Sequence, residues 1–126
     1  MRAIIDASTE AIISVDDVGH VVVFNIAAET MFRFPAAKAL GQTIDLFIPA
    51  RSRAIHRDHL RNFAEHGVSV REMGQYVRLS ALRSDGSEFP IEASISRTRA
   101  GGKNLFTVSL RDITGRREAE AAVASL

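Results

Sequence analysis

Residues 83–96, with the sequence RSDGSEFPIEASIS, combine a tight turn with a strand that has two unlike faces. Asp85-Gly86 is a dipeptide typical of hairpin turns, because the central positions of such turns favour residues that tolerate positive φ angles. After the turn, apolar and polar residues alternate as far as Ser96, and this period of two places the apolar ones on one face of a sheet. The stretch therefore predicts one hairpin of an antiparallel sheet. The apolar positions are Phe89, Ile91, Ala93 and Ile95.

Two further strands flank this segment. Residues 76–83 are strand-like and lead into the Asp85-Gly86 turn, and residues 105–110 follow a second turn at Ala100-Gly101-Gly102. The last of these strands is expected to direct Phe106, Val108 and Leu110 inward. The C-terminal half of the chain is thus predicted to form three strands joined by hairpins.

The N-terminal half begins with another hairpin and continues into helices. Two short runs of β-branched residues, 11–15 and 21–24, are joined by an Asp/Gly turn. Asn25 then stands where a strand ends and a helix begins, a position where its side chain caps free amides. Short helical pieces follow, and a longer helix is expected from about Arg51 to Glu65, ended by Gly67.

Strands in two blocks that are separated by helices predict an α+β domain built on an antiparallel sheet. We expect five strands with short helices on one face. Residues 115–126 are rich in Glu, Arg and Ala and are predicted to form a C-terminal helix. The expected division is a flanking segment at 1–10, a domain at 11–114 and the start of the helix at 115–126.

Size and composition exclude several classes of protein. A chain of 126 residues with 46% hydrophobic and 25% charged residues fits one soluble globular domain. The net charge of +1 provides no strong field for nucleic acid. Cysteine is absent, which excludes disulfides, thiolate metal sites and a flavin-cysteinyl adduct. Neither a membrane-spanning run nor a signal peptide is recognisable, so the sequence predicts a cytoplasmic protein without membrane insertion.

Four phrases in this order resemble one known family. They are AIISVD at 11–16, VFNIAAE at 23–29, RSDGSEFPIE at 83–92 and RDIT at 111–114. From about Ile4 to Arg117 the chain is similar to PAS domains of bacterial sensor histidine kinases and cyclic-di-GMP enzymes. The resemblance implies the PAS fold and a sensory or interaction module of signal transduction.

The resemblance also implies how such a module works. Binding of a small-molecule ligand or a partner is passed to an output domain in the same protein through the C-terminal helix. Asp112, Ile113 and Thr114 lie at the junction with that helix, which Thr114 is expected to cap. A homodimer is expected, and Ala119, Ala122 or Val123, and Leu126 have the spacing of a short helical seam.

Two histidines lie on the inward side of the predicted long helix. With 100° of rotation per residue and Ile55 at zero, His59 falls at about 40° and His56 at about 100°, inside the apolar stripe with Phe63. A neutral imidazole on an inward face is a natural ligand for iron or zinc. Packing residues, haem ligation and another ligand or metal all remain open at this point.

The resemblance includes haem-binding PAS domains of the oxygen-sensing type, in which the proximal histidine lies on the helix that corresponds to this one. Counting from Pro49 and from Phe63 assigns that place to His56. Two family features are missing, because Val77 stands where those sensors often carry an arginine and His59 replaces a common tyrosine. The candidate cofactor-binding residues are His56, His59, Phe63, Val77, Ile95 and Val108, with His56 as the metal ligand if the cofactor is haem.

Other functions find little support in the sequence. Asp16 and Asp17 are adjacent and fit a turn better than a carboxylate pair, and no nucleophile elbow or phosphate loop is present, so we expect no enzyme in this domain. The arginines of the long helix are interrupted by Asp58 and Glu65, which fits a solvated face rather than a nucleic-acid site. The remaining alternative is a constitutive dimerisation scaffold whose phenylalanines fill the core and leave no ligand cavity.

Overall fold

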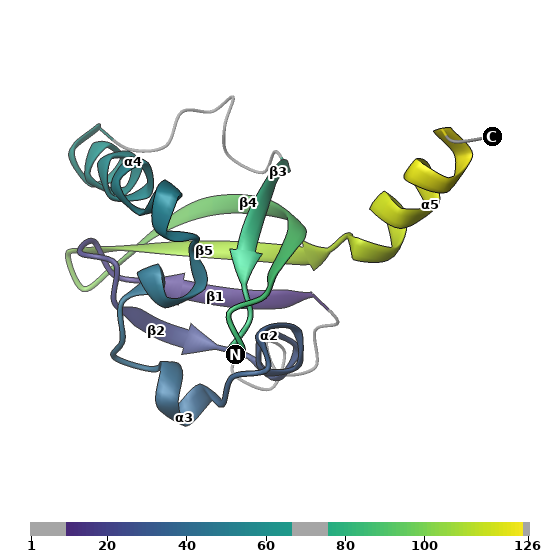
Figure 1. Ribbon diagram of the computed structural model, residues 1–126. Helices are drawn as coiled ribbons and strands as arrows, with labels where there is room; N and C mark the ends of the chain where they lie inside the picture. Colours follow the sequence, from purple (N-terminus) through teal and green to yellow (C-terminus); the bar gives the residue numbers. More distant parts are fainter. Residues whose placement is uncertain (1–9, 67–75, 125–126) are drawn as a thin grey trace.

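The computed structural model describes residues 10–66 and 76–124 and has the predicted α+β architecture (Figure 1). One five-stranded antiparallel sheet carries helices on one face. The elements are β1 (Ala11–Val15), β2 (Val21–Phe24), α2 (Ile26–Phe32), α3 (Ala36–Ala39), the 3₁₀-helices η1 (Ile44–Phe47) and η2 (Ala50–Ser52), α4 (Arg53–His66), β3 (Val77–Leu82), β4 (Glu88–Ala100), β5 (Lys103–Asp112) and α5 (Thr114–Ala124).

The last strand in sequence lies in the middle of the sheet. The strand order is β2-β1-β5-β4-β3, so β5 hydrogen-bonds to β1 on one side and to β4 on the other. Its register aligns Val108 with Ile13 and with Ile95. This central strand joins the N-terminal hairpin to the C-terminal one and makes a single sheet of both halves of the chain.

The buried core lies between the inner face of this sheet and the helices. Phe106 and Leu110 of β5 are buried, and Val108 is partly buried against the same core, as the alternation predicts. Aromatic rings fill the end of the core near α2 and η1. Phe32 contacts Phe47 with a centroid separation of 4.9 Å and Phe89 with a separation of 5.5 Å.

Two boundaries differ from the sequence prediction. The long helix begins at Arg53 and is preceded by the 3₁₀ turn η2, because the residues after Pro49 first form a tighter turn. Its predicted stop at Gly67 lies outside the described residues. Strands β4 and β5 extend to a two-residue turn at Gly101-Gly102, where φ angles of 57° and 78° match a tight hairpin rather than a loose loop.

Asn25 joins three segments at the end of β2, as its position at a strand–helix junction predicts. The buried side chain accepts hydrogen bonds from the amides of Ala28 (3.0 Å) and Ile12 (2.8 Å) and donates one to the carbonyl of Glu10 (3.0 Å). It therefore caps α2 and at the same time completes the hydrogen bonding of β1. No helix in the described part of the chain is long and apolar enough to span a membrane.

Replacing Asn25 by alanine should cost about 2–3 kcal/mol of unfolding free energy, because two amides lose their acceptor. Urea titration of the purified chain measures this loss. Asn104→Ala is the matched control, since the Oδ1 of Asn104 is buried without a hydrogen-bond partner and its removal should be nearly neutral. Equal losses in the two variants would contradict the structural role of Asn25.

Candidate functional site

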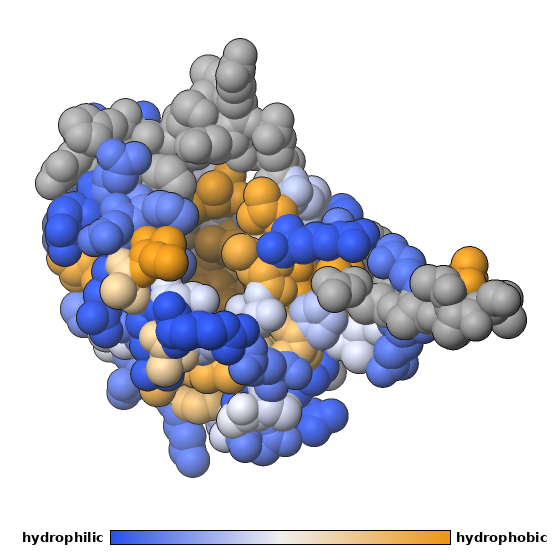
Figure 2. All heavy atoms as spheres, turned by 45° about the horizontal axis from the view of Figure 1, so that its top comes forward, coloured by the Kyte–Doolittle hydropathy of each residue, from blue (hydrophilic) through white to orange (hydrophobic). Residues whose placement is uncertain are grey.

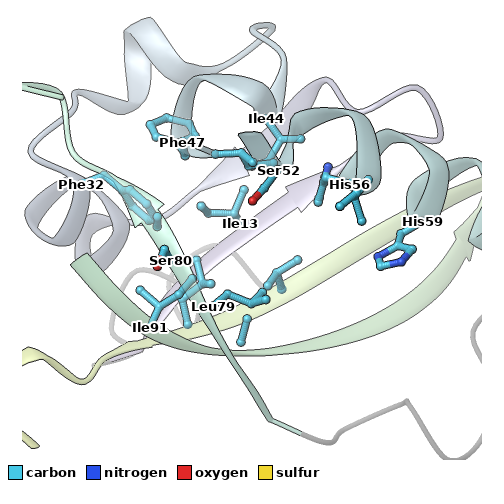
Figure 3. Close-up of a pocket in the computed structure, with 16 residues that line it drawn as sticks. Ile13, Phe32, Ile44, Phe47, Ser52, His56, His59, Leu79, Ser80 and Ile91 are labelled. Carbon is cyan, nitrogen blue, oxygen red and sulfur yellow. The ribbon is translucent and has the colours of Figure 1, made fainter. Parts of the chain in front are cut away.

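An apolar cavity of about 260 Å³ lies between the sheet and the roof formed by η1, η2 and α4 (Figure 3). Figure 2 shows its position as a recess with hydrophobic walls. Four polar residues line it: Ser52, His56, His59 and Ser80. The other lining residues are apolar: Ile13, Phe32, Ile44, Phe47, Ile48, Ile55, Leu79, Ala81, Ile91, Ala93, Val108 and Leu110.

Ion pairs fix the start of α4 above this cavity. Arg51 forms a bidentate pair with Glu88 at the start of β4, with N–O distances of 2.7 and 2.9 Å. Arg57 binds Asp45 of η1 differently, because its Nε and Nη2 both donate to the same oxygen, Oδ2, at 2.9 and 2.6 Å. The hydrogen bond from Arg51 lowers the pKa of the Glu88 carboxyl. The polar side of the helix is therefore engaged with acidic groups, which does not support a nucleic-acid site.

A third arginine holds the preceding turn. The Nε of Arg53 donates to the carbonyls of Asp45 and Ile48, at 3.1 and 3.0 Å. These carbonyls belong to η1 and to the residue that follows it. With the outward arginines fixed in this way, the opposite side of α4 is presented to the cavity.

His56 lines the cavity, and His59 lies one turn further along the same helix, where it is more exposed. The Nδ1 of His56 is buried and has no hydrogen-bond partner. Burial lowers the pKa of His56 from its usual value, the charge of Asp45 opposes this change, and His59 adds to it. The imidazole of His56 is therefore neutral at neutral pH.

The other predicted binding residues are only partly brought together. Val108 lines the cavity. Ile95 packs against the core but does not line the cavity, and Val77 is 53% exposed beyond it. Ile95 is paired with Val108 and Val77 with Ala93, so both lie on the inner face of the sheet but outside the cavity lining. Their part in binding stays a prediction. The side chain of Phe63 lies outside the described residues.

Most residues of the roof have no signal in the sequence. Ile44, Phe47 and Ser52 come from 3₁₀ turns that have no periodic signal, and Phe32 comes from the last turn of α2. Ser52 was within reach of prediction, because it lies four residues before His56 and so shares its helical face.

A connection leads from the cavity wall to the C-terminal helix. Phe32 lines the cavity, and its carbonyl accepts a hydrogen bond of 3.0 Å from the amide of Ser84 in the β3–β4 turn. The neighbouring Arg83 donates to the carbonyl of Met31 at 3.2 Å and to the carboxylate of Asp112 at 2.7 Å. Its guanidinium also lies 3.9 Å from the centre of the Phe89 ring.

Asp112 in turn holds the start of α5. Its Oδ1 accepts hydrogen bonds from the amide and the hydroxyl of Thr114, at 2.9 and 2.6 Å. The capping side chain is thus Asp112 and not Thr114, because the helix already begins at Thr114 and its hydroxyl donates instead of accepting. Ile113 between them is buried, and its amide donates to the carbonyl of Pro90 at 3.1 Å.

The five-stranded antiparallel sheet has a cavity under its helices, and a helix leaves its central strand. These features define an α+β domain with an internal cavity. The family model described as PAS fold matches residues 1–113. The chain belongs to the PAS family and is a sensory module of the kind found in signalling proteins.

Two curated relatives match almost the whole chain. An uncharacterised protein of Azorhizobium caulinodans is 36% identical over 99% of this chain, and the sensor protein FixL of Bradyrhizobium diazoefficiens is 28% identical over all of it. The chain spans only 17% and 25% of those proteins. Among solved structures, the PAS domain of the quorum-sensing receptor RpfR from Cronobacter turicensis, in complex with C12:0, has a TM-score of 0.67 at 18% identity, with 85% of this chain and 96% of that chain covered.

The depressed pKa of His56 predicts a pH-dependent stability. The unfolded chain takes up a proton near pH 6.5, at a higher pH than the folded chain does. The stabilising effect of the neutral imidazole is therefore complete above about pH 6.5 and is lost as the pH falls below it.

We expect His56→Gln to flatten the decline in unfolding free energy between about pH 7.5 and 5.5, measured by urea titration. His20→Gln, in the β1–β2 turn away from the cavity, is the control. If the unfolding free energy of His56→Gln declines as steeply with falling pH as that of the wild type, the lowered pKa of His56 is contradicted.

Proposed function

We propose that the chain is a regulatory input domain that binds a small, mostly apolar molecule in the cavity under α4. Binding is passed to an output domain in the same protein through α5, and the domain itself has no catalytic activity. The observation that carries this proposal is the cavity of about 260 Å³ in the core of the domain. The PAS domain of RpfR, solved with C12:0, is an example of a related fold that holds a small molecule.

The proposed path runs from the cavity wall to α5 by hydrogen bonds. A ligand that moves Phe32 also moves the last turn of α2, whose carbonyls are bound by Ser84 and Arg83. Arg83 shares the carboxylate of Asp112 with the start of α5. A ligand shifts this arrangement only if it binds two conformations with different affinity. In this path, the position of the Asp112 carboxylate is the feature that responds to ligand binding and acts on α5.

A constitutive scaffold with a filled core is less well supported. That alternative required the phenylalanines to occupy the whole interior, whereas Phe32 and Phe47 form walls of a cavity. The helix that would mediate a homodimer, α5, extends away from the body of the domain (Figure 1), and Val123 on it is 69% exposed. Leu126 of the expected seam lies outside the described residues. Dimerisation through α5 therefore stays a prediction.

Haem does not fit the cavity in this conformation. Pockets for drug-sized ligands enclose roughly 300–1,000 Å³, and haem is a macrocycle larger than most such ligands. The cavity of about 260 Å³ is smaller than this range. His56 offers a suitable nitrogen, but within residues 10–66 and 76–124 none of the lining residues is an arginine or lysine that would pair with the haem propionates. We therefore assign no step of the mechanism to haem.

Filling the cavity tests the proposed function. Xenon enters dry apolar cavities without any polar recognition, so we expect saturable xenon binding to the wild-type chain, measured by NMR. Val108→Phe should abolish this binding and change the amide hydrogen exchange of α5, because the added ring occupies the cavity. Val22→Phe, at an exposed position of β2, is the matched control and should leave both measurements unchanged. Xenon binding without any change in α5 would contradict the proposed transmission, and no xenon binding would contradict the cavity.

A further inference from the structure

The cavity has one polar corner in its roof. Ser52 and His56 lie one helical turn apart and both line the cavity, and Figure 3 shows the Ser52 hydroxyl directed into it. Within residues 10–66 and 76–124, the buried Nδ1 of His56 has no hydrogen-bond partner. A buried polar atom that lacks a partner is costly. A ligand that supplies the missing partner here gains a hydrogen bond that an unsubstituted hydrocarbon does not.

Among the residues that the structure describes, no fixed charge lines this corner. The 16 lining residues include no lysine, arginine, aspartate or glutamate. Asp45, the acidic group whose charge acts on His56, is bound by Arg57 outside the lining. An anion placed in the cavity would be desolvated without a fixed counter-charge, which is strongly unfavourable. The polar group that fits is therefore uncharged.

The volume limits the size of the apolar part. At about 30 Å³ per non-hydrogen atom, the volume of a liquid water molecule, the space of about 260 Å³ accommodates roughly nine such atoms, and the end of a longer chain extends through the open side into solvent. Apart from Ser80 of β3, the walls opposite the polar corner are aliphatic or aromatic, formed among others by Ile13, Ile91 and Val108. Each methylene buried against such walls increases affinity about fourfold.

We propose that the ligand of this cavity is an uncharged aliphatic compound with a terminal hydroxyl, about seven to nine non-hydrogen atoms long. Its hydroxyl lies between Ser52 and His56, where it accepts from one group and donates to the other, and its chain lies against the apolar walls. This assignment rests on the proposed function, because it names the class of molecule that the sensory cavity takes.

A series of straight-chain compounds tests the assignment on the full chain. Calorimetric titration with pentanol to decanol should show affinity rising about fourfold per methylene up to about octanol and then levelling off. At about pH 7.5, octanol should bind at least about tenfold more tightly than octanoate, whose carboxylate is ionised at this pH. Ser52→Ala should weaken octanol binding by about three- to tenfold and leave xenon binding unchanged. Ser94→Ala, in β4 and not among the lining residues, is the matched control and should have no effect on either ligand.

The outcomes separate the two proposals. If xenon binds but alcohols do not, or if octanoate binds as tightly as octanol, the ligand class is wrong and the sensory cavity stands. If Ser52→Ala binds octanol as tightly as the wild type, the placement of the hydroxyl is wrong. If neither xenon nor any alcohol binds, the proposed function fails as well. Should Ser52→Ala be unfolded by circular dichroism, the ratio of octanol to octanoate affinity in the wild type decides the ligand class.

Discussion

The pairing of β5 with both β1 and β4 is the constraint on which the rest of the structure depends. This strand closes the sheet across the whole length of the chain, since its register places residues near position 108 against residues near position 13. It also provides part of the cavity wall through Val108 and Leu110. Two residues after Leu110 the same strand ends at Asp112, which holds the first turn of α5. Cavity and output helix thus share one strand.

A second route joins the same two places through side chains. Arg83 contacts the carbonyl of Met31, the ring of Phe89 and the carboxylate of Asp112. Asp112 is thereby bound by Arg83, which contacts the core, and by Thr114 at the start of α5. Arg78 of β3 also binds Glu120 further along α5, at 3.4 Å. Asp112 nevertheless holds the first residue of the helix, which makes this carboxylate a sensitive point in the proposed mechanism.

The sequence predicted the arrangement of the fold better than the details of the site. Alternation with a period of two predicted the inward side of β5 correctly, and the cap at Asn25 followed from its place between a strand and a helix. The position of a residue along a strand has no comparable signal, and the sequence therefore did not reveal that Val77 and Ile95 lie outside the cavity lining. The roof depends on tertiary packing of 3₁₀ turns, which no local pattern in residues 44–52 reveals.

The role of Asp112 illustrates the same limit. An Asp-Ile-Thr phrase at the end of a strand suggests a cap, but only the position of the first helical turn decides which oxygen accepts the bond. Arg83 has no recognisable signal in the sequence, because its partners at positions 31, 89 and 112 are distant in the chain. Long-range contacts of this type carry the proposed mechanism and lie beyond single-sequence reasoning.

A double-mutant cycle tests the central claim most directly. Val108→Phe, Arg83→Gln and the double variant are compared by hydrogen exchange of the amides of residues 118–124. If Arg83 carries the effect of the cavity to α5, the filled cavity changes this exchange much less when Arg83 is already replaced, which gives a coupling energy of about 0.5–3 kcal/mol. Strictly additive effects of the two substitutions would contradict the account.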